Sequence, residues 1–210
     1  MNEPKKFKLS DVLLDREFKF VVTIFLSMLA FTMFARTPDR VHELCLLGMF
    51  FSTIGDLCLM DRRGVPSCIF NGKHFYAGMF SFVIAHVYYR QMFRCITPEP
   101  SFFDVGDIIT AAIMIVLFVI AYNTSFKRKS KFFFAASGFY TGIILSNLAA
   151  AINCAIAVGG TYIWAMIGVV CFIISDLFLF IREAKLDTPL IRKLVWVFYP
   201  LAQILIIMNV

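Results

Sequence analysis

Seven long, charge-poor apolar runs separated by short polar breaks dominate the sequence. They cover residues 18–36, 42–60, 74–93, 105–123, 132–157, 161–181 and 191–209. A helix needs roughly 20 apolar residues to cross the hydrocarbon core of a bilayer, and each run is about that long. The strands of a membrane barrel are shorter and alternate with period two, which these runs do not. The pattern therefore predicts an all-α, polytopic transmembrane helix bundle of about seven helices.

Composition agrees with a membrane protein. The chain of 210 residues is 60% hydrophobic and only 16% charged, and it contains 25 phenylalanines. Soluble domains usually keep about a quarter of their residues charged, so a water-soluble fold is a poor fit. The net charge of +6 is no sign of a nucleic-acid partner, because the positions of the basic residues have another explanation.

The basic residues predict the orientation of the bundle. With seven helices, sixteen of the twenty lysines and arginines fall on the side of the N-terminus, and the other side has only Arg36, Arg40, Arg90 and Arg94. Cytoplasmic loops carry an excess of Lys and Arg. We therefore expect a cytoplasmic N-terminal segment, residues 1–17, followed by a single transmembrane domain, residues 18–210.

Two aspartates lie deep inside apolar runs, Asp56 in the second and Asp176 in the sixth. A carboxylate in the bilayer costs several kcal/mol, and Asn or Ser could fill a purely structural role. Each aspartate is five or six residues from the cytoplasmic end of its run, roughly 7–9 Å at 1.5 Å per residue, so the two share one depth. We interpret them as the working pair of an intramembrane site. They can meet only if the second and sixth helices are neighbours, which the sequence leaves open.

Other polar side chains fall near the same level. Gly78, Phe82, His86 and Tyr89 form one stripe on the third run, and several pairs elsewhere are spaced four or seven residues apart. These residues predict a polar pocket lined by five helices and open toward the cytoplasmic leaflet. The candidate supporting residues are Ser52, His86, Tyr89, Tyr140, Ser175, Tyr199, Gln203 and Lys19. Taken singly, such groups are more often interhelical hydrogen-bond partners, and Lys19 is equally well a headgroup anchor.

In order and spacing, these motifs resemble the lysoplasmalogenase (YhhN-like) family. The segment 51–56, Phe-Ser-Thr-Ile-Gly-Asp, and the stretch 75–89 with its Gly, His and Tyr resemble the first family signature. The segment 172–176, Phe-Ile-Ile-Ser-Asp, resembles the second, and Tyr199-Pro-Leu-Ala-Gln203 resembles the final helix. The resemblance runs from about residue 40 to 209. Family members usually have eight helices, one more than the seven segments counted in this chain.

The resemblance implies a membrane hydrolase that cleaves the vinyl ether bond of lysoplasmalogens. The products are a fatty aldehyde and glycerophosphoethanolamine or glycerophosphocholine. It also implies residence in the endoplasmic reticulum or a related endomembrane, with the lysophospholipid substrate and membrane lipids as partners.

Vinyl ethers open under acid, through proton delivery to the β-carbon and an oxocarbenium ion. One protonated and one ionised carboxyl serve this chemistry, as they do in glycosidases. We therefore expect Asp56 and Asp176 to be catalytic, with the acid unassigned, and no metal or organic cofactor to be needed. Basic residues at the cytoplasmic rim, Arg62, Arg63 and Lys73, could attract the phosphate.

Three alternatives compete with this hypothesis. A zinc-dependent lipid amidase needs several histidine ligands, and His42 should lie at the opposite membrane face from His74, leaving too few near His86. A proton-coupled transporter or lipid-binding receptor could use the same aspartates. No inverted repeat is evident, however, and seven helices do not divide into two equal halves. A purely structural membrane protein would not need the aspartate pair.

Overall fold

The structure, a computed structural model, describes residues 16–60, 74–98, 105–123, 131–184 and 188–210. These residues form seven α-helices and no strands, and each predicted run corresponds to one helix within a few residues at either end, which confirms the all-α prediction. The helices are α2 (Arg16–Arg36), α3 (Arg40–Met60), α5 (His74–Ile96), α6 (Val105–Asn123), α7 (Lys131–Val158), α8 (Tyr162–Ala184) and α9 (Pro189–Met208).

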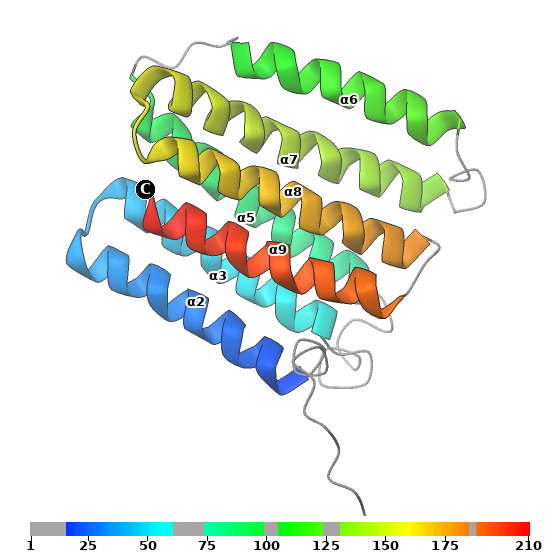
Figure 1. Cartoon of the computed structure of the whole chain (residues 1–210), viewed down its shortest axis with the longest axis horizontal. Coiled ribbons are helices and arrows are strands. Elements are labelled where there is room, and N and C mark those ends of the chain that lie inside the picture. Colours follow the sequence, from blue (N-terminus) through cyan, green and yellow to red (C-terminus); the bar gives the residue numbers. More distant parts are fainter. Residues whose placement is uncertain (1–15, 61–73, 99–104, 124–130, 185–187) are drawn as a thin grey trace, which may run out of the picture.

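Six of these helices form a closed ring. Each packs on the next in the order α2, α3, α5, α7, α8, α9, and α9 returns to α2. Helix α6 lies outside this six-helix ring against α7 (Figure 1). Helices α2, α5, α7 and α9 run in one direction and α3, α6 and α8 in the other (Figure 1). The ring therefore places α3 opposite α8, and α5 opposite α9.

The ring is apolar outside and polar inside. Large exposed side chains such as Phe25, Phe80 and Phe139 cover its outer surface, where a soluble protein would rarely tolerate them. The ring helices bury apolar residues such as Met49 and Phe172 together with ten of the eleven described buried polar or charged residues, the eleventh being Thr110 on α6. This arrangement fits a lipid solvent, which requires polar groups to find their partners inside the protein.

Five helices, α2, α3, α7, α8 and α9, are long and apolar enough to cross a membrane by length and composition. Helix α5 lies alongside them in the ring (Figure 1), and its buried residues include His74, Ser81 and His86. Because these three polar side chains are buried inside the bundle, α5 need not be apolar all round. In α6, the apolar stretch with described side chains is the shorter Val105–Val116.

The turns that join ring helices are built from local signals. Gly159 and Gly160 have φ angles of 70° and 60° and reverse the chain between α7 and α8. Non-glycine residues rarely adopt this left-handed conformation. At the start of α9, the hydroxyl of Thr188 accepts a hydrogen bond from the backbone N–H of Ile191, and Pro189 occupies the first helical position. Both features are typical of helix starts.

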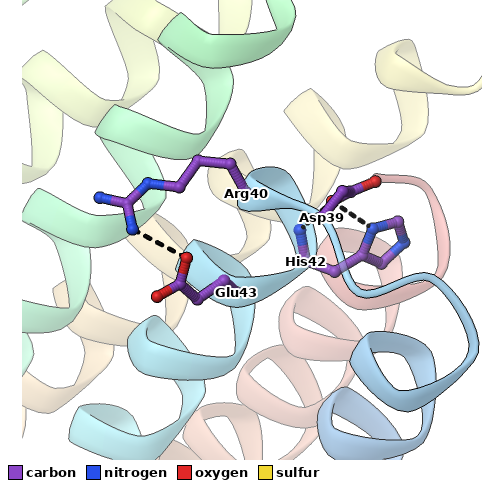
Figure 2. A network of polar contacts seen from close by, with 4 residues as sticks. All are labelled: Asp39, Arg40, His42 and Glu43. Atoms are coloured by element: carbon purple, nitrogen blue, oxygen red, sulfur yellow. Dashed lines mark hydrogen bonds and ion pairs between the residues drawn. The ribbon is translucent and has the colours of Figure 1, made fainter.

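Helix α3 begins with a network of polar contacts among Asp39, Arg40, His42 and Glu43 (Figure 2). The carboxylate of Asp39 accepts a hydrogen bond from the backbone N–H of His42 at 2.9 Å and lies 2.8 Å from the His42 Nδ1 atom. Arg40 forms an ion pair with Glu43 at 2.8 Å. The backbone N–H of His42 is the main cause that lowers the pKa of Asp39 below its usual value. Asp39 is thus the N-cap of α3.

We predict that Asp39→Ala lowers the free energy of unfolding by about 1 kcal/mol at neutral pH, because the first turn of α3 loses its cap. Thermal unfolding in detergent measures the change. A lowered folded-state pKa means that the ionised cap contributes above the ordinary Asp pKa, and that this contribution fades as pH falls through the lowered value. Asp39→Asn keeps a capping oxygen and should lose less; equal losses for Ala and Asn would contradict the capping role.

Candidate active site

Asp56 points from α3 into the ring, where only 5% of its surface is exposed. Two hydroxyl groups donate hydrogen bonds to its Oδ2 atom. Thr23 on α2 donates through Oγ1 at 3.0 Å, and Tyr199 on α9 donates through its phenol at 2.6 Å. Hydrogen bonds of this kind stabilise a buried carboxylate, because they replace the water that it has lost.

Asp176 occupies the corresponding place on α8, with 7% of its surface exposed. The phenol of Tyr140, on the neighbouring helix α7, donates a hydrogen bond to its Oδ2 atom. Tyr140 is itself buried, so the pair is shielded from solvent. Each aspartate therefore has a tyrosine from another helix as a hydrogen-bond donor.

The two aspartates lie on opposite helices of the ring, and no hydrogen bond joins them among the described residues. A series of contacts between aromatic side chains connects Tyr199, which bonds to Asp56, with Tyr140, which bonds to Asp176. Tyr199 contacts Phe172 at 5.5 Å between ring centroids, Phe172 contacts His86 at 4.5 Å, and His86 contacts Tyr140 at 6.0 Å. Asp56 and Asp176, through Tyr199 and Tyr140, lie at the two ends of this aromatic series. They thus share the interior of the ring although α3 and α8 are not adjacent.

His86 and Asn147 meet in the same interior, and both are fully buried. The Asn147 amide nitrogen lies 3.1 Å from the His86 Nδ1 atom. When that amide donates, the imidazole is neutral and holds its hydrogen on Nε2. Neither His86 Nε2 nor Asn147 Oδ1 has a hydrogen-bond partner in the described structure. One donor and one acceptor are therefore available inside the ring, and buried groups of this kind normally bind water or a ligand.

A directed series of hydrogen bonds crosses the ring from α5 to Asp56. The phenol of Tyr89 donates to Gln203 Oε1 at 2.7 Å, and Gln203 Nε2 lies 3.5 Å from the Tyr199 hydroxyl, to which it donates. Tyr199 in turn donates to Asp56. Ser52 Oγ lies beside Tyr89, yet it makes no hydrogen bond within normal limits. The structure therefore brings eight of the ten predicted site residues into one central polar cluster. With Thr23 and Asn147, this cluster is Thr23, Ser52, Asp56, His86, Tyr89, Tyr140, Asn147, Asp176, Tyr199 and Gln203.

Two predicted residues lie at the margin of this cluster. The Ser175 hydroxyl donates to the backbone carbonyl of Val195 on α9 at 3.2 Å, and so joins α8 to α9 rather than bonding to the Asp176 carboxylate. Lys19 places its Nζ atom 5.2 Å from the centroid of the Trp196 ring, near the start of α2. The rim residues Arg62, Arg63 and Lys73 lie outside the described residues.

Sequence reasoning missed Thr23 and Phe172. Thr23 is a single threonine in an apolar run, and such residues usually bond to their own helix, as Thr32 does with Met28 O. Only the packing of α2 on α3 turns Thr23 toward a carboxylate. Phe172 was noted merely as part of a motif, although it lies between His86 and Tyr199. Nothing in a phenylalanine-rich chain distinguishes this one before the fold is known.

The three histidines occupy separate places. His42 lies at the start of α3, His74 at the start of the antiparallel α5, and His86 three helical turns after His74, about 18 Å along the axis. This spacing does not offer the joint ligand set that a catalytic zinc ion needs.

A ring of helices that is apolar outside, with two carboxyl groups and their hydroxyl donors inside, defines a multi-pass membrane protein with an intramembrane polar site. The chain belongs to the YhhN family, whose sequence profile matches residues 15–210. This family includes lysoplasmalogenases. The match confirms the resemblance and extends it through α2, which supplies Thr23. No curated protein and no solved structure shows a match to the chain.

We predict a coupling of about 0.6 to 1.7 kcal/mol between Tyr89 and Gln203, from the mean to the maximum measured for hydrogen bonds between the helices of a membrane protein. The variants Tyr89→Phe, Gln203→Met and their combination form a double-mutant cycle, read by unfolding in detergent. The bond crosses between opposite helices of the ring, so its loss should loosen the ring itself. The control variant is Met208→Leu, because Met208 is an exposed residue on α9, the helix that carries Gln203. Strict additivity of the two changes would contradict the bond.

Proposed function

We propose that this protein is a lysoplasmalogenase that hydrolyses the vinyl ether bond of a lysoplasmenyl phospholipid by acid catalysis. The observation that carries the proposal is the pair Asp56 and Asp176, on opposite helices of an otherwise largely apolar ring, each bonded to a tyrosine. Family membership supports the same reaction class.

The reaction needs one proton donor and one anion. A carboxylic acid transfers its proton to the β-carbon of the C=C bond, and the remaining positive charge is shared between the α-carbon and the ether oxygen. Water adds to the α-carbon and returns a proton to the carboxylate, which gives a hemiacetal. Proton transfer from the hemiacetal hydroxyl to the ether oxygen then breaks the C–O bond and releases aldehyde and alcohol. Asp56 and Asp176 supply the acid and the anion, as a carboxyl pair does for the oxocarbenium-like state in glycosidases.

The central polar cluster can also position water. His86 Nε2, Asn147 Oδ1 and Ser52 Oγ are buried with hydrogen-bonding capacity to spare. In an interior of low dielectric, a water molecule held by such groups is oriented before it reacts. We infer that these three side chains bind the nucleophilic water or the free hydroxyl of the glycerol.

Lys19 and Trp196 are suited to the phosphate headgroup. Lys19 precedes Thr23 by four residues, or about 6 Å of helix rise, and Thr23 bonds to Asp56. A three-carbon glycerol bridge between phosphate and vinyl ether has a similar length. The contact between α2 and α9, where Lys19 meets Trp196, is the least extensive in the ring. We infer that the lysolipid reaches the aspartates along this contact from the predicted cytoplasmic leaflet, with the endoplasmic reticulum or a related endomembrane as the site of action.

The test is aldehyde release from a lysoplasmenyl phospholipid by the purified protein in detergent, with a chelator present. Wild type should release aldehyde, and Asp56→Asn and Asp176→Asn should each reduce kcat by at least a hundredfold, since an amide supplies neither proton nor charge. Asp107→Asn is the matched control. It removes a carboxylate from α6, where Asp107 bonds to Asn153 outside the ring, and should leave kcat unchanged.

Three outcomes would overturn the proposal. Full activity in both ring variants would remove the aspartates from the chemistry. Activity lost with the chelator would indicate a metal enzyme. A well-folded wild type that releases no aldehyde, but whose proton or lipid movement depends on the same aspartates, would identify a transporter or lipid-binding protein instead.

A further inference from the structure

The two halves of the ring repeat one another in sequence. Residues 47–59, Leu-Gly-Met-Phe-Phe-Ser-Thr-Ile-Gly-Asp-Leu-Cys-Leu, align without a gap with residues 167–179, Ile-Gly-Val-Val-Cys-Phe-Ile-Ile-Ser-Asp-Leu-Phe-Leu. The alignment pairs Asp56 with Asp176. In the following ring helices, residues 82–86, Phe-Val-Ile-Ala-His, align with residues 199–203, Tyr-Pro-Leu-Ala-Gln. Helices α3 and α5 therefore correspond to α8 and α9.

The contacts within the two halves repeat as well. A Cβ atom on Gly48 would lie 2.4 Å from the Tyr89 ring, and one on Gly168 would lie 3.0 Å from Ile206. Tyr89 and Ile206 are counterparts in the alignment. A glycine thus allows the same close helix approach at the same height in each half.

The two halves also correspond in the contacts made by Gly55 and Ser175, the residues that directly precede the aspartates. A Cβ atom on Gly78 would lie 3.2 Å from the carbonyl oxygen of Gly55, and Ser175 donates a hydrogen bond to the Val195 carbonyl. Gly55 corresponds to Ser175, and Gly78 to Val195. The two tightest helix pairs in the ring, α3–α5 and α8–α9, therefore pack alike.

The ring has an approximate two-fold axis through its centre. Rotation about it carries α2, α3 and α5 onto α7, α8 and α9, and corresponding helices run in the same direction (Figure 1). Helix α6 is the odd helix outside. The repeat is thus parallel rather than inverted, and although the seven helices do not divide into two equal halves, the six ring helices do. Helix α6 lies between the two halves in the chain, so counting the helices alone does not reveal this division.

The hydrogen bonds to the two aspartates are partly equivalent under the two-fold axis and partly different. Thr23 and Tyr140, on the corresponding helices α2 and α7, each donate to an aspartate of the next helix in the chain. Tyr199 makes a second bond to Asp56, across the two halves. Its counterpart is Phe82, which has no hydroxyl group. Phe82 contacts Phe172, one helical turn before Asp176, at 5.9 Å between ring centroids.

The series Tyr89, Gln203 and Tyr199 extends this difference. Its donors all point toward Asp56, so each bond polarises the next and favours a negative charge there. The counterpart of Gln203 is His86, which contacts Asn147 instead of passing a hydrogen bond to Phe82. Asp56 thus accepts from two hydroxyl groups and Asp176 from one among the described residues.

We propose that this broken symmetry assigns the two catalytic roles: Asp56 is the permanent carboxylate that faces the oxocarbenium ion, and Asp176 carries the proton to the β-carbon. The assignment rests on the proposed function. Hydrogen-bond donation to a carboxylate favours its ionised form, and two carboxyl groups in one apolar interior favour a single shared negative charge. Asp176 gives its proton to the β-carbon, becomes a carboxylate, and recovers a proton from the attacking water. Tyr199 is then a positioning residue that keeps the charge on Asp56.

Infrared spectroscopy tests the assignment without using activity. The purified wild type at neutral pH should have the carbonyl stretching band of one protonated carboxyl group in an apolar environment. Asp176→Asn should remove this band, and Asp56→Asn should keep it. The double variant Phe82→Tyr/Tyr199→Phe moves the phenolic hydroxyl from position 199 to position 82 and should place the proton on Asp56. In that background, Asp56→Asn should remove the carbonyl band and Asp176→Asn should keep it.

Kinetics give a second readout. The titratable side chains of the central polar cluster are Asp56, Asp176, His86, Tyr89, Tyr140 and Tyr199, and the buried Cys45, Cys58, Cys154, Cys171 and His74 lie elsewhere on the ring helices. Tyr199→Phe should lower kcat at least tenfold with little change in KM, the effect expected for losing a hydrogen bond to a charged group. Phe82→Tyr gives Asp176 a second donor and stabilises its anion. The high-pH limb of the kcat profile should therefore move to lower pH, which a merely structural role would not produce.

The lysoplasmalogenase proposal and the assignment of roles to Asp56 and Asp176 can be contradicted independently of each other. A band removed by Asp56→Asn and kept in Asp176→Asn, or a band unaffected by either, overturns the role assignment even if aldehyde is released. The expected band pattern in a wild type that releases no aldehyde keeps the asymmetry and overturns the lysoplasmalogenase proposal. If one Asn variant does not fold, the test is the kcat–pH profile of Phe82→Tyr. A high-pH limb that stays at the wild-type position would then contradict the assignment.

Discussion

The structure depends on satisfying two carboxyl groups in a bundle that faces lipid. Lipid offers no hydrogen bonds, so the donors for Asp56 and Asp176 must lie inside the bundle. Thr23, Tyr140 and Tyr199 fill this need from α2, α7 and α9. These bonds hold α2 and α9 to α3 around Asp56 and α7 to α8 around Asp176, and the aromatic contacts of Phe172 and His86 join the two groups in one interior. A ring with polar contents and an apolar outer surface is the arrangement that meets this requirement.

The sequence predicted the helices well and left their arrangement open. Counting residues from the ends of apolar runs placed Asp56 and Asp176 at one level, because rise along a helix axis is the same for any sequence. Which helices touch depends on packing between faces that all look apolar in this chain. The diagonal placement of α3 and α8, the position of α6 outside the ring and the role of Thr23 were therefore beyond reach.

The parallel repeat changes the weight of the competing functions. The absence of two equal halves counted against a transporter, and the ring removes that objection, because parallel repeats also occur in transporters. The argument for an enzyme now rests on the family and on the site. Here one carboxyl has a second hydroxyl donor, Tyr199, and its counterpart position has Phe82.

A duplicated site begins with two equivalent carboxyl groups, whereas acid catalysis needs two different ones. The difference in this ring is one phenolic oxygen. With a tyrosine at both positions, the single negative charge would be divided between the aspartates, and the acid and the anion would exchange places. With phenylalanine at position 82, the hydrogen bonds from α5 and α9 converge on Asp56 alone, so the proton is left on Asp176. In the proposed reaction, the cation then always forms facing the same carboxylate, and the proposed substrate needs only one binding orientation.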